Sequence, residues 1–125
     1  MDQVRVFRPQ VKEASSTTQT SGMIREQLVS TPNSWVGMVR ITPGSLSDWH
    51  HHAEYDTYVY VISGMIRFEH GPKGAEICDV TSGEVGHVPK HLVHRESNPS
   101  SEDGVAFVVR AGTGEPVFNV DGPDS

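Results

Sequence analysis

Short apolar or alternating segments, each ended by glycine or proline, run along most of this chain. Residues 35–41 form a strand-like, mostly apolar run that ends at Pro43-Gly44, and residues 57–62 form an apolar run that ends at Gly64. The further segments of this kind are residues 65–70, 75–80, 85–88 and 105–110. Side chains on a strand alternate between two faces, so this pattern predicts many short strands joined by turns. No helical periodicity of useful length interrupts it, and a β-sandwich or barrel is expected.

The ends of the chain are less regular than its middle. Residues 4–7 alternate and predict a short edge strand, and residues 23–29 fit either a strand or one helical turn. Residues 117–120 could pair at a sheet edge. We therefore expect a single domain over residues 1–125. Its parts are a core barrel at about 35–112, an N-terminal arm at 1–30 and a C-terminal tail at 113–125.

Composition excludes several classes of protein. The 125 residues carry a formal net charge of −6 without a basic run, so no nucleic-acid surface is expected. The single cysteine, Cys78, excludes an intrachain disulfide and is expected to be a small buried hydrophobe. No apolar stretch has the length of a membrane span, and the N-terminus lacks the apolar core of a secretory signal. These features predict a soluble, cytoplasmic protein.

Histidine is concentrated in two places. The first cluster is His50-His51-His52, and the second contains His87, His91 and His94. On a strand, His50 and His52 point to the same side while His51 points away. A third imidazole from a neighbouring strand would complete a site for a first-row transition metal.

These residues resemble the motifs of the cupin family. Gly44 is followed after five residues by His50-His51-His52, and Gly64 closes the first motif. Gly83, Pro89, His94 and Asn98 match the second, with His91 in place of its middle glycine. The resemblance covers roughly residues 41–110. It implies an all-β fold, a double-stranded β-helix or jelly-roll barrel.

The sequence departs from the family pattern at one ligand. The glutamate of the first motif falls on Thr57, which has no carboxylate. The resemblance then implies a metal site made of His50, His52 and His94, and Thr57 is expected to face the cavity without ligating. Glu54 could swing in from the connection before the strand, whereas Asp56 is out of register. One divalent transition metal is expected, and imidazole ligands are compatible with Fe, Mn, Ni, Cu or Zn.

Three readings of function stay open. The first is a metal-dependent dioxygenase or isomerase/lyase acting on a small carbonyl or phenolic compound, with Glu54, His87 and His91 as candidate catalytic bases. The second is a non-catalytic ligand-binding or sensor protein, and the third is a decayed barrel that serves as a dimeric scaffold. A general base near the metal would favour the first, and an apolar pocket without one would favour the second.

The segment 57–62 also bears on assembly. It is largely apolar on both faces, so we expect each face to be covered. One cover is the barrel interior, and the other is the N-terminal segment or a second copy of the chain. Small cupins are often dimers, and a homodimer with exchange of the segment 4–7 is expected.

Overall fold

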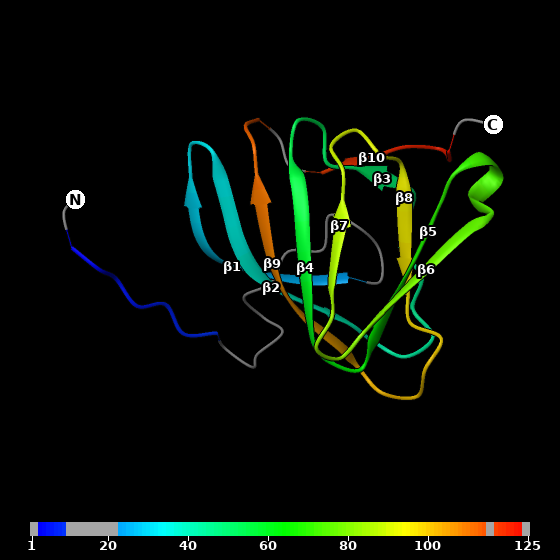
Figure 1. Ribbon diagram of the computed structural model, residues 1–125, viewed down its shortest axis with the longest axis horizontal. Coiled ribbons are helices and arrows are strands. Elements are labelled where there is room, and N and C mark those ends of the chain that lie inside the picture. The colour runs from blue at the N-terminus through cyan, green and yellow to red at the C-terminus, as the bar shows by residue number, and fades with distance from the viewer. Residues whose placement is uncertain (1–2, 10–22, 115–116, 124–125) are drawn as a thin grey trace.

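Antiparallel strands make up nearly all the regular structure of the chain. The structure is a computed structural model that describes residues 3–9, 23–114 and 117–123. One sheet has the order β1 (Met23–Thr31), β2 (Ser34–Ile41), β9 (Gly104–Ala111), β4 (Asp56–Ser63), β7 (Val85–Val88). The other has the order β10 (Phe118–Asn119), β3 (His50–His51), β8 (His94–Ser97), β5 (Met65–His70), β6 (Glu76–Thr81) (Figure 1). A single 3-10 turn, Pro72–Gly74, is the one helical element of the described residues.

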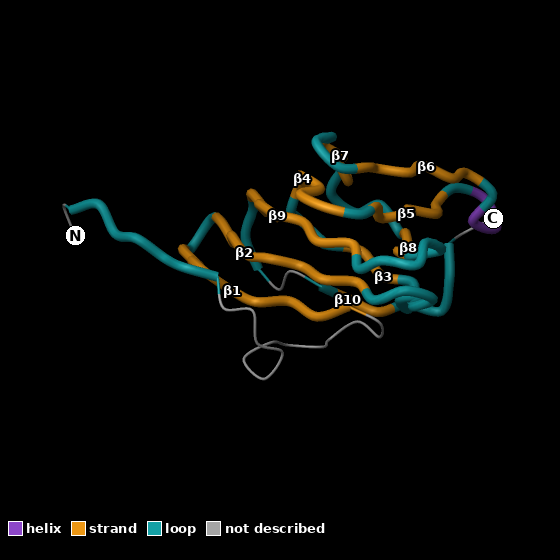
Figure 2. The backbone as a smooth tube through the Cα atoms, turned by 90° about the horizontal axis from the view of Figure 1, so that it is seen from below, coloured by secondary structure: helices purple, strands orange, loops and turns teal. Residues whose placement is uncertain are grey.

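The two sheets face each other and enclose the core, as Figure 2 shows from below. Alternation along each strand sends every second side chain inward, so β2 and β9 bury alternate residues along their length. The buried apolar cluster between the sheets includes Val39, Ile41, Val61, Ala106 and Val108. The prediction of an all-β jelly-roll barrel is confirmed.

Turns fix the connections between the sheets. Gly64, between β4 and β5, has φ 71°, and a Cβ there would lie 2.2 Å from the carbonyl oxygen of Asp103. Both conditions favour glycine. Asn98 is buried after β8, where its side-chain amide donates to the carbonyl oxygens of Ile41 (2.9 Å) and Glu102 (2.7 Å). The amide therefore ties down this loop.

The strands differ from the sequence predictions in four places. Residues 23–31 form β1, so the first sheet starts before the expected barrel boundary at residue 35. Residues 4–9 form no strand, and Figure 1 shows residues 3–9 extending away from both sheets. The polar strand β8 was not predicted. Cys78 is exposed on β6 rather than buried, because β6 lies at an edge of its sheet.

The outer face of β4 is not covered by the described residues. Tyr58, Tyr60 and Ile62 are 42%, 45% and 46% exposed, whereas the inward Val59 and Val61 are buried. The expected inner cover is therefore present, and no outer cover lies within the described parts of the chain. No helix in these parts is long and apolar enough to cross a membrane.

Candidate metal centre

Two strands of the second sheet bring the predicted histidines together. His50 lies on β3 and pairs in register with His94 on β8, and His52 directly follows β3. All three side chains are buried. His51 points to the other side, where its ring stacks on Phe118 with centroids 5.4 Å apart. The alternation predicted for this segment is therefore observed.

A glutamate joins the three histidines. One ligand atom from each of His50, His52, His94 and Glu96 lies within 4.8 Å of the others, and all four residues are buried. Glu96 is two residues after His94 on β8, so the two side chains share the inward face. The histidine ring centroids lie 4.3 to 5.1 Å apart.

Backbone carbonyls fix the tautomers of two histidines. Nδ1 of His50 lies 2.8 Å from the carbonyl oxygen of Asp48, and Nδ1 of His94 lies 2.9 Å from that of Leu92. A carbonyl oxygen only accepts, so each Nδ1 donates, and in the neutral ring Nε2 keeps its lone pair. The Nε2 atoms of His50 and His94 therefore point into the cluster as potential metal ligands.

Glu96 faces both of these Nε2 atoms. Its Oε2 lies 3.3 Å from His50 Nε2, and its Oε1 lies 3.2 Å from His94 Nε2. The His50 atom is buried and makes no hydrogen bond in the described structure. Two lone pairs facing a carboxylate repel unless a proton or a cation lies between them. The donor set thus calls for positive charge at its centre.

Burial and neighbouring charges tune the cluster in the direction that metal binding requires. Burial, followed by the charge of Arg110, holds the pKa of His52 well below its usual range, which favours the neutral ligand form. Burial acts to raise the pKa of Glu96, but the charge and hydrogen bonds that His50 and His94 supply when protonated outweigh it and hold that pKa well below its usual range. A metal ion in place of these protons would supply positive charge at the same position. Glu96 is therefore an anion. The backbone N–H of Glu96 donates a hydrogen bond to Ser47 Oγ at 2.8 Å.

The cluster fits a divalent transition metal. Ligand atoms around one ion at about 2.1 Å are separated by about 3 to 4 Å, so atoms within 4.8 Å need only a small contraction. Three imidazole nitrogens and one carboxylate oxygen suit Fe, Mn, Ni, Cu and Zn alike. The orphaned Nε2 of His50 is the atom that such an ion would satisfy.

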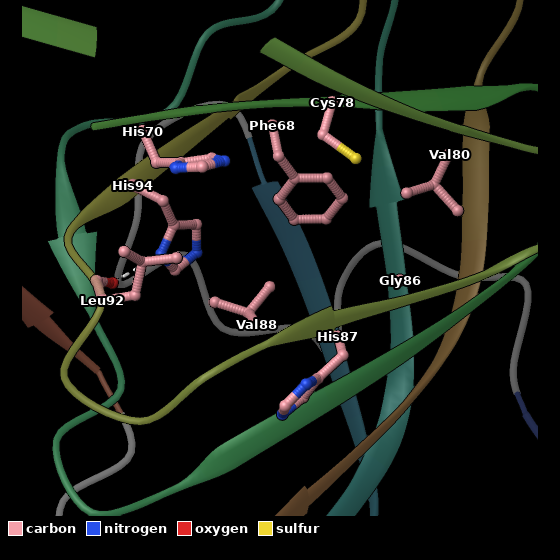
Figure 3. A pocket seen from close by; sticks show the side chains of 9 residues that line it. All are labelled: Phe68, His70, Cys78, Val80, Gly86, His87, Val88, Leu92 and His94. Carbon is pink, nitrogen blue, oxygen red and sulfur yellow. Dashed lines mark hydrogen bonds between the residues drawn. The ribbon is translucent and has the colours of Figure 1, made fainter. Parts of the chain in front are cut away.

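A small cavity opens beside His94, and Figure 3 shows its lining. Its volume is about 70 Å³, compared with roughly 300 Å³ or more for a typical ligand pocket. Phe68, Val80, Val88 and Leu92 make most of the wall apolar. His70, which pairs in register with His94, is a further titratable side chain on this wall.

The three candidate bases lie outside the centre. His91 Nε2 is 3.0 Å from a carboxylate oxygen of Glu54, and their side chains are 57% and 61% exposed. The His87 ring stacks on Tyr58 and its Nε2 lies 3.1 Å from Asp56, so it faces outward. Figure 3 shows this ring turned away from Phe68 and His94, although the residue borders the cavity. None of the three candidates reaches the histidine cluster.

Glu96 and His70 were not predicted from the sequence as residues of the site. The signal for Glu96 was present, because a residue two positions after a buried strand histidine shares its face. The segment His94–Ser97 contains no apolar residue, so it was not read as a strand. His70 was expected at the surface, but Phe68 and Ile66 point inward with the same parity.

Comparisons with known proteins agree on the architecture. A family model described as "Cupin domain" matches residues 37–110. No curated protein matches the sequence. An uncharacterised Klebsiella pneumoniae protein with a double-stranded beta-helix domain has a TM-score of 0.71 at 21% identity, over 94% of this chain and 98% of that one.

Two further solved structures cover most of the chain. A cupin-like protein from Thermotoga maritima has a TM-score of 0.70 at 16% identity, over 91% of this chain and 90% of that one. A sugar phosphate isomerase of the cupin superfamily from Silicibacter pomeroyi has a TM-score of 0.63 at 22% identity, over 80% of this chain and 66% of that one. At such low identities these likenesses show the fold alone.

Proposed function

This chain belongs to the cupin family, and from that premise we propose that it is a small metal-binding protein that holds a ligand at its metal. The proposed ligands to one divalent transition metal are His50, His52, His94 and Glu96. The observation that carries the proposal is the pair of Nε2 atoms directed at the buried carboxylate of Glu96, which needs protons or a metal ion between them. Such an arrangement is costly without a cation and favourable with one.

A metal held by four protein groups keeps positions open for a small oxygen ligand, whose carbonyl or hydroxyl it can polarise. The chain's own contribution is to orient that ligand and to exclude water. Phe68, Val88 and Leu92 form an apolar wall next to His94, and the small volume limits the ligand to few atoms unless these side chains move.

An enzyme of dioxygenase or isomerase/lyase type is the more specific form of the proposal, with a small carbonyl or phenolic compound as substrate. His70 supports it, since it is a titratable side chain on the cavity wall outside the proposed ligand set. It would serve as the proton acceptor in place of Glu54, His87 and His91. The isomerase named above shares the fold with this chain, and that likeness alone leaves the reaction open.

A non-catalytic ligand-binding or sensor protein is the second candidate. The apolar character of the cavity and the outward position of all three predicted bases favour it. Replacing His70 by Phe separates the two candidates once a ligand is known. If His70 is the base, the His70→Phe protein should lose turnover and keep ligand binding. A sensor has no turnover to lose, and its ligand affinity should change only through the altered shape of the cavity.

Elemental analysis of protein purified without a histidine tag tests the proposal. One equivalent of a transition metal per chain is expected, and the double substitution His50→Ala and His52→Ala should abolish it while the protein stays folded. The exposed pair His87→Ala and His91→Ala is the matched control and should keep its metal. Metal-free wild-type protein that also fails to take up Fe, Mn, Ni, Cu or Zn would support the scaffold reading instead.

A further inference from the structure

An arginine is buried inside the barrel close to the candidate metal centre. Arg110 lies on β9, is 3% exposed, and has an Nε without a hydrogen-bond partner in the described structure. Its guanidinium carbon lies 4.4 Å from the centroid of the Trp35 ring, with Trp35 opposite it in register on β2. Buried arginines are almost always paired with an anion, so the open position of Arg110 needs an explanation.

Buried charges of both signs act on Arg110. Arg25, a second buried arginine, acts on Arg110 with the same sign, while Glu96 is the buried carboxylate acting on both. Burial, and next the charge of Arg25, lower the pKa of Arg110 to about 9, so it remains a cation at neutral pH. A metal at the histidine cluster would engage Glu96 and leave less negative charge for the arginines.

A small space inside the barrel adjoins Arg110. Its volume is about 10 Å³, room for about one water-sized group, and its wall includes Glu96, Arg110 and Phe68. Phe68 also lines the larger cavity beside His94. Phe68 therefore borders both the cavity at the candidate metal centre and the space at the arginine.

The hydroxyl of Thr57 is a second donor without a described partner, and it lies on the strand next to Arg110. It faces the interior at 2% exposure and pairs in register with Arg110, and its Oγ1 has no hydrogen-bond partner in the described structure. Directly opposite residues have Cβ atoms about 4.5–5.5 Å apart, so one small anion can reach both side chains.

We propose that Arg110, together with the hydroxyl of Thr57, binds the carboxylate of a small organic-acid ligand inside the barrel. The proposal narrows the ligand of the proposed function to small organic acids. It rests on the proposed function in one respect only, which is that the same ligand also contacts the metal. The planar guanidinium matches a carboxylate with two parallel hydrogen bonds. A phosphate is disfavoured because its additional oxygens would face Val39, Val59 and Ile66, which offer no donors.

Trp35 gives a direct readout of an anion at Arg110. The chain has two tryptophans, and Trp49 contacts Arg95 on another part of the molecule, with 4.5 Å from the guanidinium carbon to the ring. In a Trp49→Phe background, Trp35 is the sole tryptophan. An anion that pairs with Arg110 changes the cation–π contact and hence the emission of Trp35.

The experiment is a titration of chelator-treated Trp49→Phe protein with sodium acetate at constant ionic strength. A saturable change in Trp35 emission is expected. Arg110→Met should weaken the apparent affinity at least about tenfold, and Thr57→Val about three- to tenfold. Arg95→Gln, which removes a partly exposed arginine paired with Glu69, is the matched control and should titrate like its parent.

Several results would overturn the assignment. They are the lack of a saturable response, an unchanged response in Arg110→Met, and an equal response to inorganic phosphate or chloride. If Arg110→Met does not fold, Arg110→Lys keeps the charge but loses the planar fork, and an unchanged acetate affinity in that variant also contradicts the proposal. The protein is metal-free in this titration, so loss of acetate binding and loss of metal binding are measured separately.

Discussion

At the candidate metal centre, Thr57 lacks the carboxylate that the family pattern places at its position, and Glu96 supplies a carboxylate from another strand. The family pattern puts a carboxylate at the position of Thr57 on β4, and here that position carries a hydroxyl facing the interior. The carboxylate comes instead from Glu96 on β8, beside His94 in the other sheet. The proposed donor set of three imidazoles and one carboxylate therefore has its carboxylate on a different strand from the one in the family pattern.

Replacing Glu96 by Gln should weaken metal binding by more than about 10- to 100-fold, which is the loss typical of a group that only supports a ligand. The amide keeps the size of the side chain but removes the anion between His50 and His94. Competition with a chromophoric chelator measures the change, and Glu69→Gln, which affects a carboxylate paired with Arg95, is the control. Equal affinity of the Glu96→Gln and wild-type proteins would remove Glu96 from the ligand set.

At the scale of single residues, the sequence predicted which histidines come together but not which other side chains surround them. Period-two alternation and motif spacing indicated that His50, His52 and His94 converge. Glu54, His87 and His91 were chosen for chemical type and proximity in sequence. Their exposure depends on how the loops and the sheet edge β7 are placed, which no local pattern specifies.

At the scale of strands, apolar alternation predicted the elements that contribute to the core. β2, β4, β5, β7 and β9 lie within one or two residues of their predicted bounds. β8 was missed because His94–Ser97 lines the polar centre on one side and is accessible on the other, so it carries no apolar signal. β1 stayed ambiguous because Arg25, a residue typical of surfaces, occupies one of its inward positions.

Gly64 is predicted to be the most sensitive of the turn glycines in this chain. Gly64→Ala should lower the free energy of unfolding by more than about 1 kcal/mol, because Cβ would collide with the Asp103 carbonyl in addition to the positive φ. Gly83→Ala is the control, since its φ is 88° but no atom lies within 4 Å of its Cβ. Urea denaturation of both variants is the measurement, and equal losses would contradict the steric argument.

The β5–β6 hairpin carries a pH-dependent ion pair. Arg67 donates to both carboxylate oxygens of Asp79, at 2.8 and 3.1 Å, and this holds the pKa of Asp79 below its usual 3.8. Because the pKa of Asp79 is lower in the folded than in the unfolded protein, the ion pair contributes its full stability above pH 3.8. That contribution is lost as the pH falls through the pKa of Asp79 in the folded protein.

Asp79→Asn should therefore melt below wild type at pH 7 and at pH 4.5, with the gap narrowing at pH 3. Melting curves at these three pH values check the prediction. Asp103 forms a longer ion pair, with 3.7 Å between its Oδ2 and Arg40 Nε. Asp103→Asn should therefore lower the melting temperature at pH 7 by less than Asp79→Asn does. A gap that widens as the pH falls would contradict the sign of the effect.

At the scale of the whole molecule, an apolar strip crosses the outer face of the first sheet. Met38 on β2, Phe107 on β9, Tyr60 on β4 and Val85 on β7 are consecutive partners in register. Tyr60, Phe107 and Val85 are exposed. A contiguous apolar surface of this kind is typical of an interface, and a second copy of the chain remains the predicted cover.

Light scattering at micromolar concentration should give a mass near twice 13.7 kDa. Tyr60→Glu should reduce it to that of one chain, because a charge would be buried in the interface. Ile77→Glu, at an exposed isoleucine on β6, is the control and should stay dimeric. A single-chain mass for wild type would refute the dimer, whereas loss of the dimer on deleting residues 1–10 would support strand exchange.

The central claim is that one metal ion is held by His50, His52, His94 and Glu96. Anomalous diffraction at the absorption edge of the co-purified or added metal tests it most directly. One strong anomalous peak is expected within about 2.3 Å of the three imidazole nitrogens and a carboxylate oxygen of Glu96. A peak bound elsewhere, or metal-soaked crystals with no peak between these four side chains, would contradict it.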